Sequence, residues 1–420
     1  MGYNRRLDAA NRLERVKERV RPYYLRWLYF PLHPDRKPSY FDRPWQFPAS
    51  TDITAHRQPS FLFLPMTDWH TRLQRTQHLA RSIAQRGHAC FYLNPHVGRE
   101  FPNPYPFSSS PQLRYLDPLV AEVHVQLPAE PVFHHRLLRR SEVSRLADAL
   151  EPLLGSSPAP QLVSLPTWWP VAEELRRRGN HPVIYDCHDV LSGFPNMARE
   201  IVDAEAAAIE GSDLVLFSSR GLVGQWSDRA KRWMLLRNAV DDSWLQRELR
   251  APGERTKYAD YIGALDSWFD MEAIAHAAGH LADWTFRLIG RVEHEPIRTR
   301  LASFRNVEFL GEVTHERLHD YLKDTRVALI PFLRNELTLA TNPIKLYEYF
   351  SYGLPVVASR LPEIEEYGSL VHFYDGASTL ARAVESAAND ARGPERRAIA
   401  ARETWGQRVD VLLGVASRLA

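Results

Sequence analysis

Residues 335–359 have the sequence NELTLATNPIKLYEYFSYGLPVVAS, and this stretch decides the fold. Its centre predicts a short helix beginning at Asn342 and Pro343, because asparagine caps helix N-termini and proline suits the first helical position. An apolar strand-like run, 327–332, precedes the stretch, and another follows Gly353. A helix between two continuous apolar strands indicates a parallel sheet covered on both faces.

Two charged residues of this helix have a spacing that suits ligand binding. Lys345 falls in the first turn, where free backbone amides, the helix dipole and an ammonium group together hold a phosphate well. Glu348 lies three residues later and therefore on about the same helix face. A carboxylate there can accept both hydroxyls of a ribose while the lysine holds a diphosphate. On spacing alone, the alternative is an ordinary surface lysine–glutamate pair.

Strand–helix alternation continues on both sides of this stretch. A first series begins near Ser60 with a βαβ unit, in which a helix over 72–86 ends at Gly87. Its strands are expected at 61–65, 89–93, 162–165, 183–186 and 214–217, with two more between 113 and 127. A second series opens near Lys257, with strands expected at 258–262, 285–289, 307–310, 327–330, 355–358 and 371–374.

The predicted fold class is therefore α/β, with two Rossmann-like doubly wound parallel-sheet domains facing a central cleft. We place the domains at residues 59–245 and 257–376, with a charged linker at 246–256 and closing helices at 377–420. Ligands of such sheets bind outside the carboxyl ends of the strands, so the cleft is the expected site. Dehydrogenases, binding proteins, epimerases and glycosyltransferases share this architecture, and fold alone does not decide among them.

Length and composition agree with two domains and limit the partners. The chain has 420 residues, 44% of them hydrophobic and 25% charged, as in an ordinary globular protein. A formal net charge of +2 gives no argument for nucleic acid. Cys90 and Cys187 stand in or beside apolar runs, which predicts buried reduced thiols and a cytosolic location. We expect neither a signal peptide nor a membrane-spanning helix.

The first 58 residues differ from the rest of the chain. Apolar and aromatic residues recur at helix-like spacing over 1–28, between basic residues at Arg5, Arg6, Arg12, Arg15, Lys17, Arg19, Arg21 and Arg26. This pattern is typical of a basic amphipathic helix that lies on an anionic membrane surface. The alternative is a solvated arm that packs its apolar stripe on its own domain. A proline-rich connector follows over 31–48.

The segment from Pro343 to Val357 resembles the nucleotide-sugar signature of GT-B glycosyltransferases, especially bacterial family 4 and related polysaccharide enzymes. The likeness covers roughly residues 60–375. Further matching segments are YDCHD (185–189), DLVLFSS (213–219), RNAVD (237–241), YIGALD (261–266), FRLIGR (286–291), NVEFLG (306–311) and VALIPF (327–332). The resemblance implies transfer of a sugar from a nucleoside diphosphate sugar, with Glu348 contacting the donor ribose.

Two departures from the family pattern bear on the reaction. Retaining members usually carry a second glutamate eight positions before the one matching Glu348, and that position is Ala340. The familiar basic pair after the first strand of the donor domain is also missing. Lys345 and Arg291 then become the expected diphosphate contacts, as similarity to the glucuronosyltransferase of xanthan synthesis also implies. The expected donor site comprises Gly263, Gly290, Arg291, Asn342, Lys345 and Glu348, and retention or inversion of the anomeric configuration stays open.

The first domain supplies candidates for the acceptor side. An inverting reaction needs a base for the acceptor hydroxyl, and Asp189 is the candidate because it follows the strand over 183–186 into the cleft. His188 is expected to orient Asp189 or to share its task; otherwise Asp189 caps a helix or ties its loop to a backbone amide. Asp68 and Trp69, after the first strand, are expected to contact the acceptor or to pack beneath the domain interface.

We therefore expect a metal-independent glycosyltransferase without a cofactor, using a nucleoside diphosphate sugar with uridine as the favoured base. The basic arm fits a saccharide or lipid-linked acceptor in bacterial cell-surface polysaccharide synthesis, with the enzyme at the inner face of the cell membrane. Two alternatives stay open. One is a sugar-nucleotide epimerase of the same architecture, and the other is a non-catalytic subunit that binds a nucleotide sugar or scaffolds an assembly complex.

Overall fold

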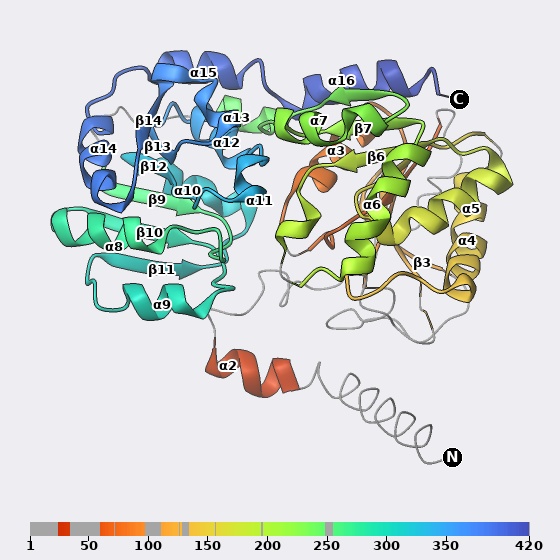
Figure 1. The fold of residues 1–420 in the computed structure, drawn as a ribbon, viewed down its shortest axis with the longest axis horizontal. Coiled ribbons are helices and arrows are strands. Elements are labelled where there is room, and N and C mark those ends of the chain that lie inside the picture. Colours follow the sequence, from red (N-terminus) through yellow and green to blue (C-terminus); the bar gives the residue numbers. More distant parts are fainter. Residues whose placement is uncertain are drawn as a thin grey trace.

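The computed structural model describes residues 24–33, 59–70, 72–96, 111–125, 127, 134–155, 157–194, 196–247 and 255–419. The residues from Pro59 onward form two α/β lobes that lie next to each other (Figure 1). Most of the predicted arm, at residues 1–23 and 34–58, and most of the predicted linker, at 248–254, lie outside the described residues.

The first lobe is built on a sheet whose described strands follow the order β3-β4-β2-β1-β5-β6-β7-β8. Neighbouring strands are parallel except β3 and β4, which pair antiparallel at one edge. The strands are β1 (Phe61–Leu64), β2 (Cys90–Leu93), β3 (Gln112–Asp117), β4 (Val120–His124), β5 (Gln161–Val163), β6 (Val183–Cys187), β7 (Leu214–Phe217) and β8 (Trp233–Leu235). The helices are α3 (Arg75–Ala84), α4 (Arg140–Leu154), α5 (Trp169–Gly179), α6 (Arg199–Gly211) and α7 (Arg220–Trp226).

The second lobe is built on an all-parallel sheet of order β11-β10-β9-β12-β13-β14 within the described residues. Its strands are β9 (Tyr258–Ile262), β10 (Thr285–Ile289), β11 (Val307–Gly311), β12 (Val327–Ile330), β13 (Val356–Ser359) and β14 (Val371–Tyr374). Its helices are α8 (Met271–His280), α9 (Glu295–Leu301), α10 (Leu318–Leu322), α11 (Glu336–Leu339), α12 (Ile344–Ser351), α13 (Pro362–Glu365), α14 (Leu380–Ala387) and α15 (Gly393–Ala400).

In each sheet the strand order reverses at one point, and this reversal determines where a ligand site can form. Strand order runs one way from β1 through β2 and the other way from β5, and the same reversal separates β10 from β12 on the two sides of β9. Loops that leave neighbouring strands at such a switch point turn to opposite faces, so a crevice opens at the strand carboxyl ends. The loop after β1 and the loop after β9 therefore border the predicted cleft.

The predicted strands are confirmed, and the two predicted buried thiols of Cys90 and Cys187 are confirmed as free and buried. The sequence missed β8, a three-residue strand at the sheet edge whose Trp233 is partly exposed. The predicted helix over 72–86 was too long, since α3 begins only at Arg75. The buried Gln77 side chain bonds the Arg72 carbonyl at 2.6 Å and accepts the Gln74 amide at 3.1 Å, which holds residues 72–74 outside the helix.

The last helix, α16 (Trp405–Ala416), returns to the first lobe (Figure 1). Thr404 caps it, and the backbone amide of Trp405 bonds the Val240 carbonyl at 3.0 Å. Its buried Val409 and Leu412 share a core with the buried face of α3. The Trp405 indole stacks on the His78 ring with 5.2 Å between centroids. The first lobe is therefore completed by residues from the far end of the chain.

A short helical segment lies apart from both lobes (Figure 1). It consists of a π-helix over Leu25–Tyr29 and α2 (Phe30–Leu32). Among its described side chains, Trp27, Leu28 and Leu32 are exposed. Among the described helices, none has the length and apolar character needed to cross a membrane.

The role of α16 can be measured by replacing its first residue. Trp405 is 1% exposed, so Trp405→Ala should lower the free energy of unfolding by about 3–5 kcal/mol through lost burial and a cavity. Urea denaturation of both variants measures this. Trp27→Ala is the matched control, because that indole is 73% exposed and its removal should change stability by about 0.5 kcal/mol or less. Equal effects of the two substitutions would contradict a structural role for α16.

Candidate active site

A cavity of about 440 Å³ lies between the lobes and is lined by residues of both. This volume is within the range of small-molecule sites. The lining comes from the loops after β1, β6, β9, β10 and β11 and from the start of α12. Predicted site residues in the lining are Trp69, His188, Asp189, Gly263, Gly290, Asn342, Lys345 and Glu348, whereas Asp68 and Arg291 are not part of it.

The helix that carries Lys345 and Glu348 begins one residue later than predicted. Pro343 has extended backbone angles and takes the N-cap position, so Ile344 is the first helical residue. Asn342 is therefore not the cap. Its side chain accepts a hydrogen bond from the Asn238 backbone amide at 2.9 Å and donates one to Glu363 Oε2 at 3.1 Å. These partners lie on both lobes, so Asn342 joins the lobes at the rim of the cavity.

Lys345 extends into the cavity between aromatic rings. Its ammonium lies 4.8 Å from the Phe332 ring centroid and 5.4 Å from that of Tyr261. Within the described residues, no hydrogen bond or ion pair reaches this ammonium. Burial lowers the pKa of Lys345 to about 8, while Glu348 acts in the opposite direction. A buried cation without a close counter-ion favours binding of an anion from solution.

The cavity wall next to Lys345 is formed by the backbone of two glycines, which carry no side chain. Gly263 has φ 146° and Gly290 has φ 154°, both outside the range that other residues usually adopt. A Cβ on Gly290 would stand 1.8 Å from the Gly263 carbonyl oxygen, and one on Gly263 would stand 3.3 Å from Lys345 Nζ. The ends of β9 and β10 can therefore approach each other and the lysine only as glycines.

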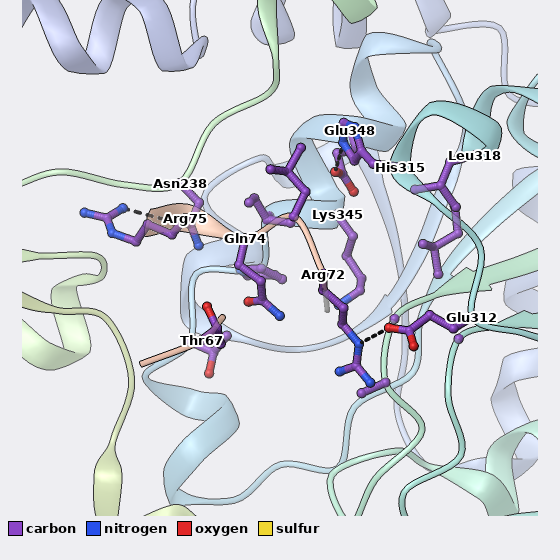
Figure 2. A pocket seen from close by; sticks show the side chains of 18 of the residues that line it. Thr67, Arg72, Gln74, Arg75, Asn238, Glu312, His315, Leu318, Lys345 and Glu348 are labelled. Carbon is purple, nitrogen blue, oxygen red and sulfur yellow. Dashed lines mark hydrogen bonds and ion pairs between the residues drawn. The ribbon is translucent and has the colours of Figure 1, made fainter. Parts of the chain in front are cut away.

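Glu348 is 6% exposed and borders the same cavity. Its Oε1 lies 3.4 Å from Nε2 of His315, a residue of the loop after β11 (Figure 2). The His315 ring in turn packs on Trp244, with 4.6 Å between centroids. The sequence analysis missed His315, because an isolated histidine after a strand carries no local signal.

Asp189 faces the cavity from the first lobe. Its Oδ2 lies 3.8 Å from His188 Nε2, and among the described residues no hydrogen bond to its carboxylate is found. Burial raises the pKa of Asp189, with the neighbouring His188 opposing this shift. His188 Nδ1 bonds the Asp186 carbonyl at 2.9 Å, so its Nε2 is turned toward Asp189. The Asp186 carboxylate receives Arg75 Nε at 2.9 and 3.0 Å and serves as an anchor.

Two predicted contacts are not brought into the cavity. Asp68 folds back on its own loop, where Oδ1 accepts the His70 amide at 2.8 Å. Arg291 has its Nε 3.4 Å from Glu293 and is not among the residues that line the cavity. Trp69 does line the cavity, held edge-on against Tyr92 at 5.0 Å. Asp68 and Arg291 therefore each have a polar partner close to them in the chain.

At position 340, where the family pattern has a second glutamate, this chain has a buried alanine. Ala340 is buried, and its carbonyl accepts the Ser219 hydroxyl of the first lobe at 2.5 Å. A Cβ on Gly221 would stand 3.0 Å from the Ala340 Cα. The acidic residues that line the cavity, within the described part of the chain, are Asp189, Glu312, Glu316 and Glu348.

The part of the chain that carries these site residues is similar to a known protein family. Residues 260–390, which include Gly263, Gly290, Lys345 and Glu348, match the model of the family described as glycosyl transferases group 1. The match is confined to the second lobe. The chain is also 24% identical over 252 residues to TuaH of Bacillus subtilis (strain 168), which is named as a glycosyltransferase of teichuronic acid biosynthesis. That match covers 53% of this chain and 64% of the length of TuaH.

Solved structures extend the likeness in fold over both lobes. A sucrose-phosphate synthase from Thermosynechococcus elongatus matches with a TM-score of 0.66 at 17% identity, over 86% of this chain and 99% of the other. A trehalose-6-phosphate protein from E. coli, bound with UDP-2-fluoro glucose, matches with a TM-score of 0.62 at 13% identity, over 85% and 99%. The two-domain prediction is confirmed: the chain has the GT-B fold.

Proposed function

We propose that the protein transfers a sugar from a nucleoside diphosphate sugar, with uridine as the favoured base, to a hydroxyl of a saccharide or lipid-linked acceptor. The observation that carries this proposal is Lys345, a buried ammonium without a close counter-ion, facing a glycine-lined wall of the cavity between the lobes. The match to the group 1 glycosyltransferase family and the uridine nucleotide on a structural relative support the same donor class.

The proposed chemistry uses residues of both lobes. Lys345 and the start of α12 would stabilise the negative charge that grows on the diphosphate as the glycosidic bond breaks. Glu348 would accept the ribose hydroxyls. Asp189 would take the proton of the attacking acceptor hydroxyl, with inversion at the anomeric carbon. The site supplies its positive charge from side chains, so we propose that transfer needs no metal ion.

Donor binding tests the proposed site. Isothermal titration with UDP, GDP and ADP sugars should find one donor class that binds, and both Lys345→Ala and Glu348→Ala should weaken its affinity about 10- to 100-fold. Lys257→Ala is the matched control, because that exposed lysine pairs with Asp283 at the surface and should leave affinity unchanged. If wild-type protein binds no nucleotide sugar, the proposed function fails and a scaffold role is favoured.

Asp189→Asn separates transfer from binding alone. The variant should bind donor normally and lose transfer about 10²- to 10⁴-fold, the usual contribution of a general base.

The pH dependence of transfer gives a second test of Asp189. Burial raises the pKa of Asp189, so wild-type transfer should increase as pH rises through that pKa, because the base must be deprotonated. Product analysis by chromatography measures both, with Asp203→Asn on the exposed face of α6 as the control. Conversion of the donor to an epimer without acceptor would instead support an epimerase.

The exposed aromatic segment supports a membrane-bound acceptor. The basic residues of 1–28 and the exposed Trp27 and Leu28 together match a surface that binds anionic lipid. We therefore expect the full chain to sediment with anionic vesicles and not with neutral ones, and deletion of residues 1–28 to abolish this. Sedimentation that survives the deletion would contradict the membrane proposal. Synthesis of a cell-surface polysaccharide is the corresponding proposed role; the name of TuaH places that protein in teichuronic acid biosynthesis.

A further inference from the structure

A loop of the first lobe holds an arginine across the cavity. Residues 72–74 leave β1 in an extended course that the buried Gln77 fixes, since its Nε2 bonds both the Arg72 carbonyl at 2.6 Å and the Asp68 carbonyl at 2.9 Å. The backbone of Arg72 is thus set by the core of its own lobe. Its side chain lines the cavity that Lys345 lines from the opposite lobe.

The Arg72 guanidinium contacts two carboxylates of the second lobe. Nε lies 3.1 Å from Glu312 Oε1, and Nη2 lies 3.1 Å from Glu293 Oε1. The Arg72 side chain is only 25% exposed, so these ion pairs are partly shielded from water. Figure 2 shows Arg72 reaching toward Glu312 in the same part of the pocket into which Lys345 extends.

Glu312 is an incompletely satisfied partner. Its side chain is 5% exposed, and within the described residues its Oε2 has no hydrogen-bond partner. Burial also raises the pKa of Glu312, with Arg72 as the main opposing influence. A buried carboxylate with one unbonded oxygen costs free energy, so this arrangement is poor as a purely structural contact.

Arg72 and Lys345 repel each other in the empty site. The positive charge of Arg72 contributes to the lowered pKa of Lys345. An anion that lies between the two cations would remove this repulsion. A diphosphate carries a negative charge on each phosphate, and guanidinium groups bind phosphate oxygens in a bidentate way.

We propose that Arg72 is a second ligand of the donor diphosphate, supplied by the acceptor-side lobe, and that Glu312 holds this arginine while the site is empty. The inference rests on the proposed function. Donor binding then exchanges Glu312 for a diphosphate as the partner of Arg72. The charge that stabilises the leaving nucleotide comes from both lobes, so it is complete only when the lobes are together. Such a requirement limits donor hydrolysis in an open cleft.

The test is a double-mutant cycle on UDP affinity, measured by isothermal titration. Arg72→Gln should weaken UDP binding about 10- to 100-fold, as expected for a charge-assisted hydrogen bond. Glu312→Gln should tighten it several-fold, because the arginine is released. In the Arg72→Gln background, Glu312→Gln should have no effect, since no held arginine remains. Arg300→Gln is the matched control, because its pair with Glu272 lies at the surface.

Opposite signs of the two single variants distinguish ligand exchange from loss of structure, since misfolding would weaken UDP binding in both. Wild-type affinity in Arg72→Gln, or weakened affinity in Glu312→Gln, overturns the inference. So does an Arg72→Gln effect confined to a donor with a uronate sugar, because the arginine would then contact the sugar. If Lys345→Ala loses UDP binding and Arg72→Gln does not, the proposed function stands and only this inference fails. Absence of UDP binding by the wild type defeats both.

Discussion

A buried polar junction between the lobes is the contact on which the cavity depends. Asp186 binds Arg75, Arg75 donates to Asn238 at 3.1 Å, and Asn238 exchanges hydrogen bonds with Asn342 of the other lobe. Asn342 continues the chain of contacts to Glu363. If the lobes slid apart here, several buried polar groups would lose their partners at once, which is costly. The junction therefore fixes how the two sheets face each other.

This fixed geometry divides the proposed chemistry between the lobes. The candidate base, Asp189, belongs to the loop after β6, whereas Lys345 and Glu348 belong to α12 directly beyond the junction. Asp186, which anchors the junction, also holds His188 through its backbone carbonyl. The same few residues thus position the acceptor side and connect it to the donor side.

The features predicted from the sequence are those that depend on residues close together in the chain. Continuous apolar runs identified the central strands, and the spacing of Lys345 and Glu348 identified one helix face, because both signals need only neighbouring residues. His315, Arg72 and the contact of Asn342 with the other lobe could not be assigned from sequence, since the partners lie far away in the chain. Arg291 was expected as a diphosphate contact from the family resemblance, and in the structure its Nε lies 3.4 Å from Glu293, a pairing that the resemblance did not indicate. Strand β8 was missed because an exposed edge needs no apolar run.

The return of α16 makes the first lobe discontinuous in the chain. Its core is completed by residues that follow the whole second lobe, so the first lobe does not correspond to one uninterrupted stretch of gene. Recombination between relatives at a single crossover in the linker would pair the first lobe with a foreign final helix. Exchange of the second lobe by domain shuffling therefore requires two crossovers, the second one before Thr404. Evolution of the first lobe is constrained in the same way, because changes on α3 must remain compatible with a helix encoded more than 300 residues later.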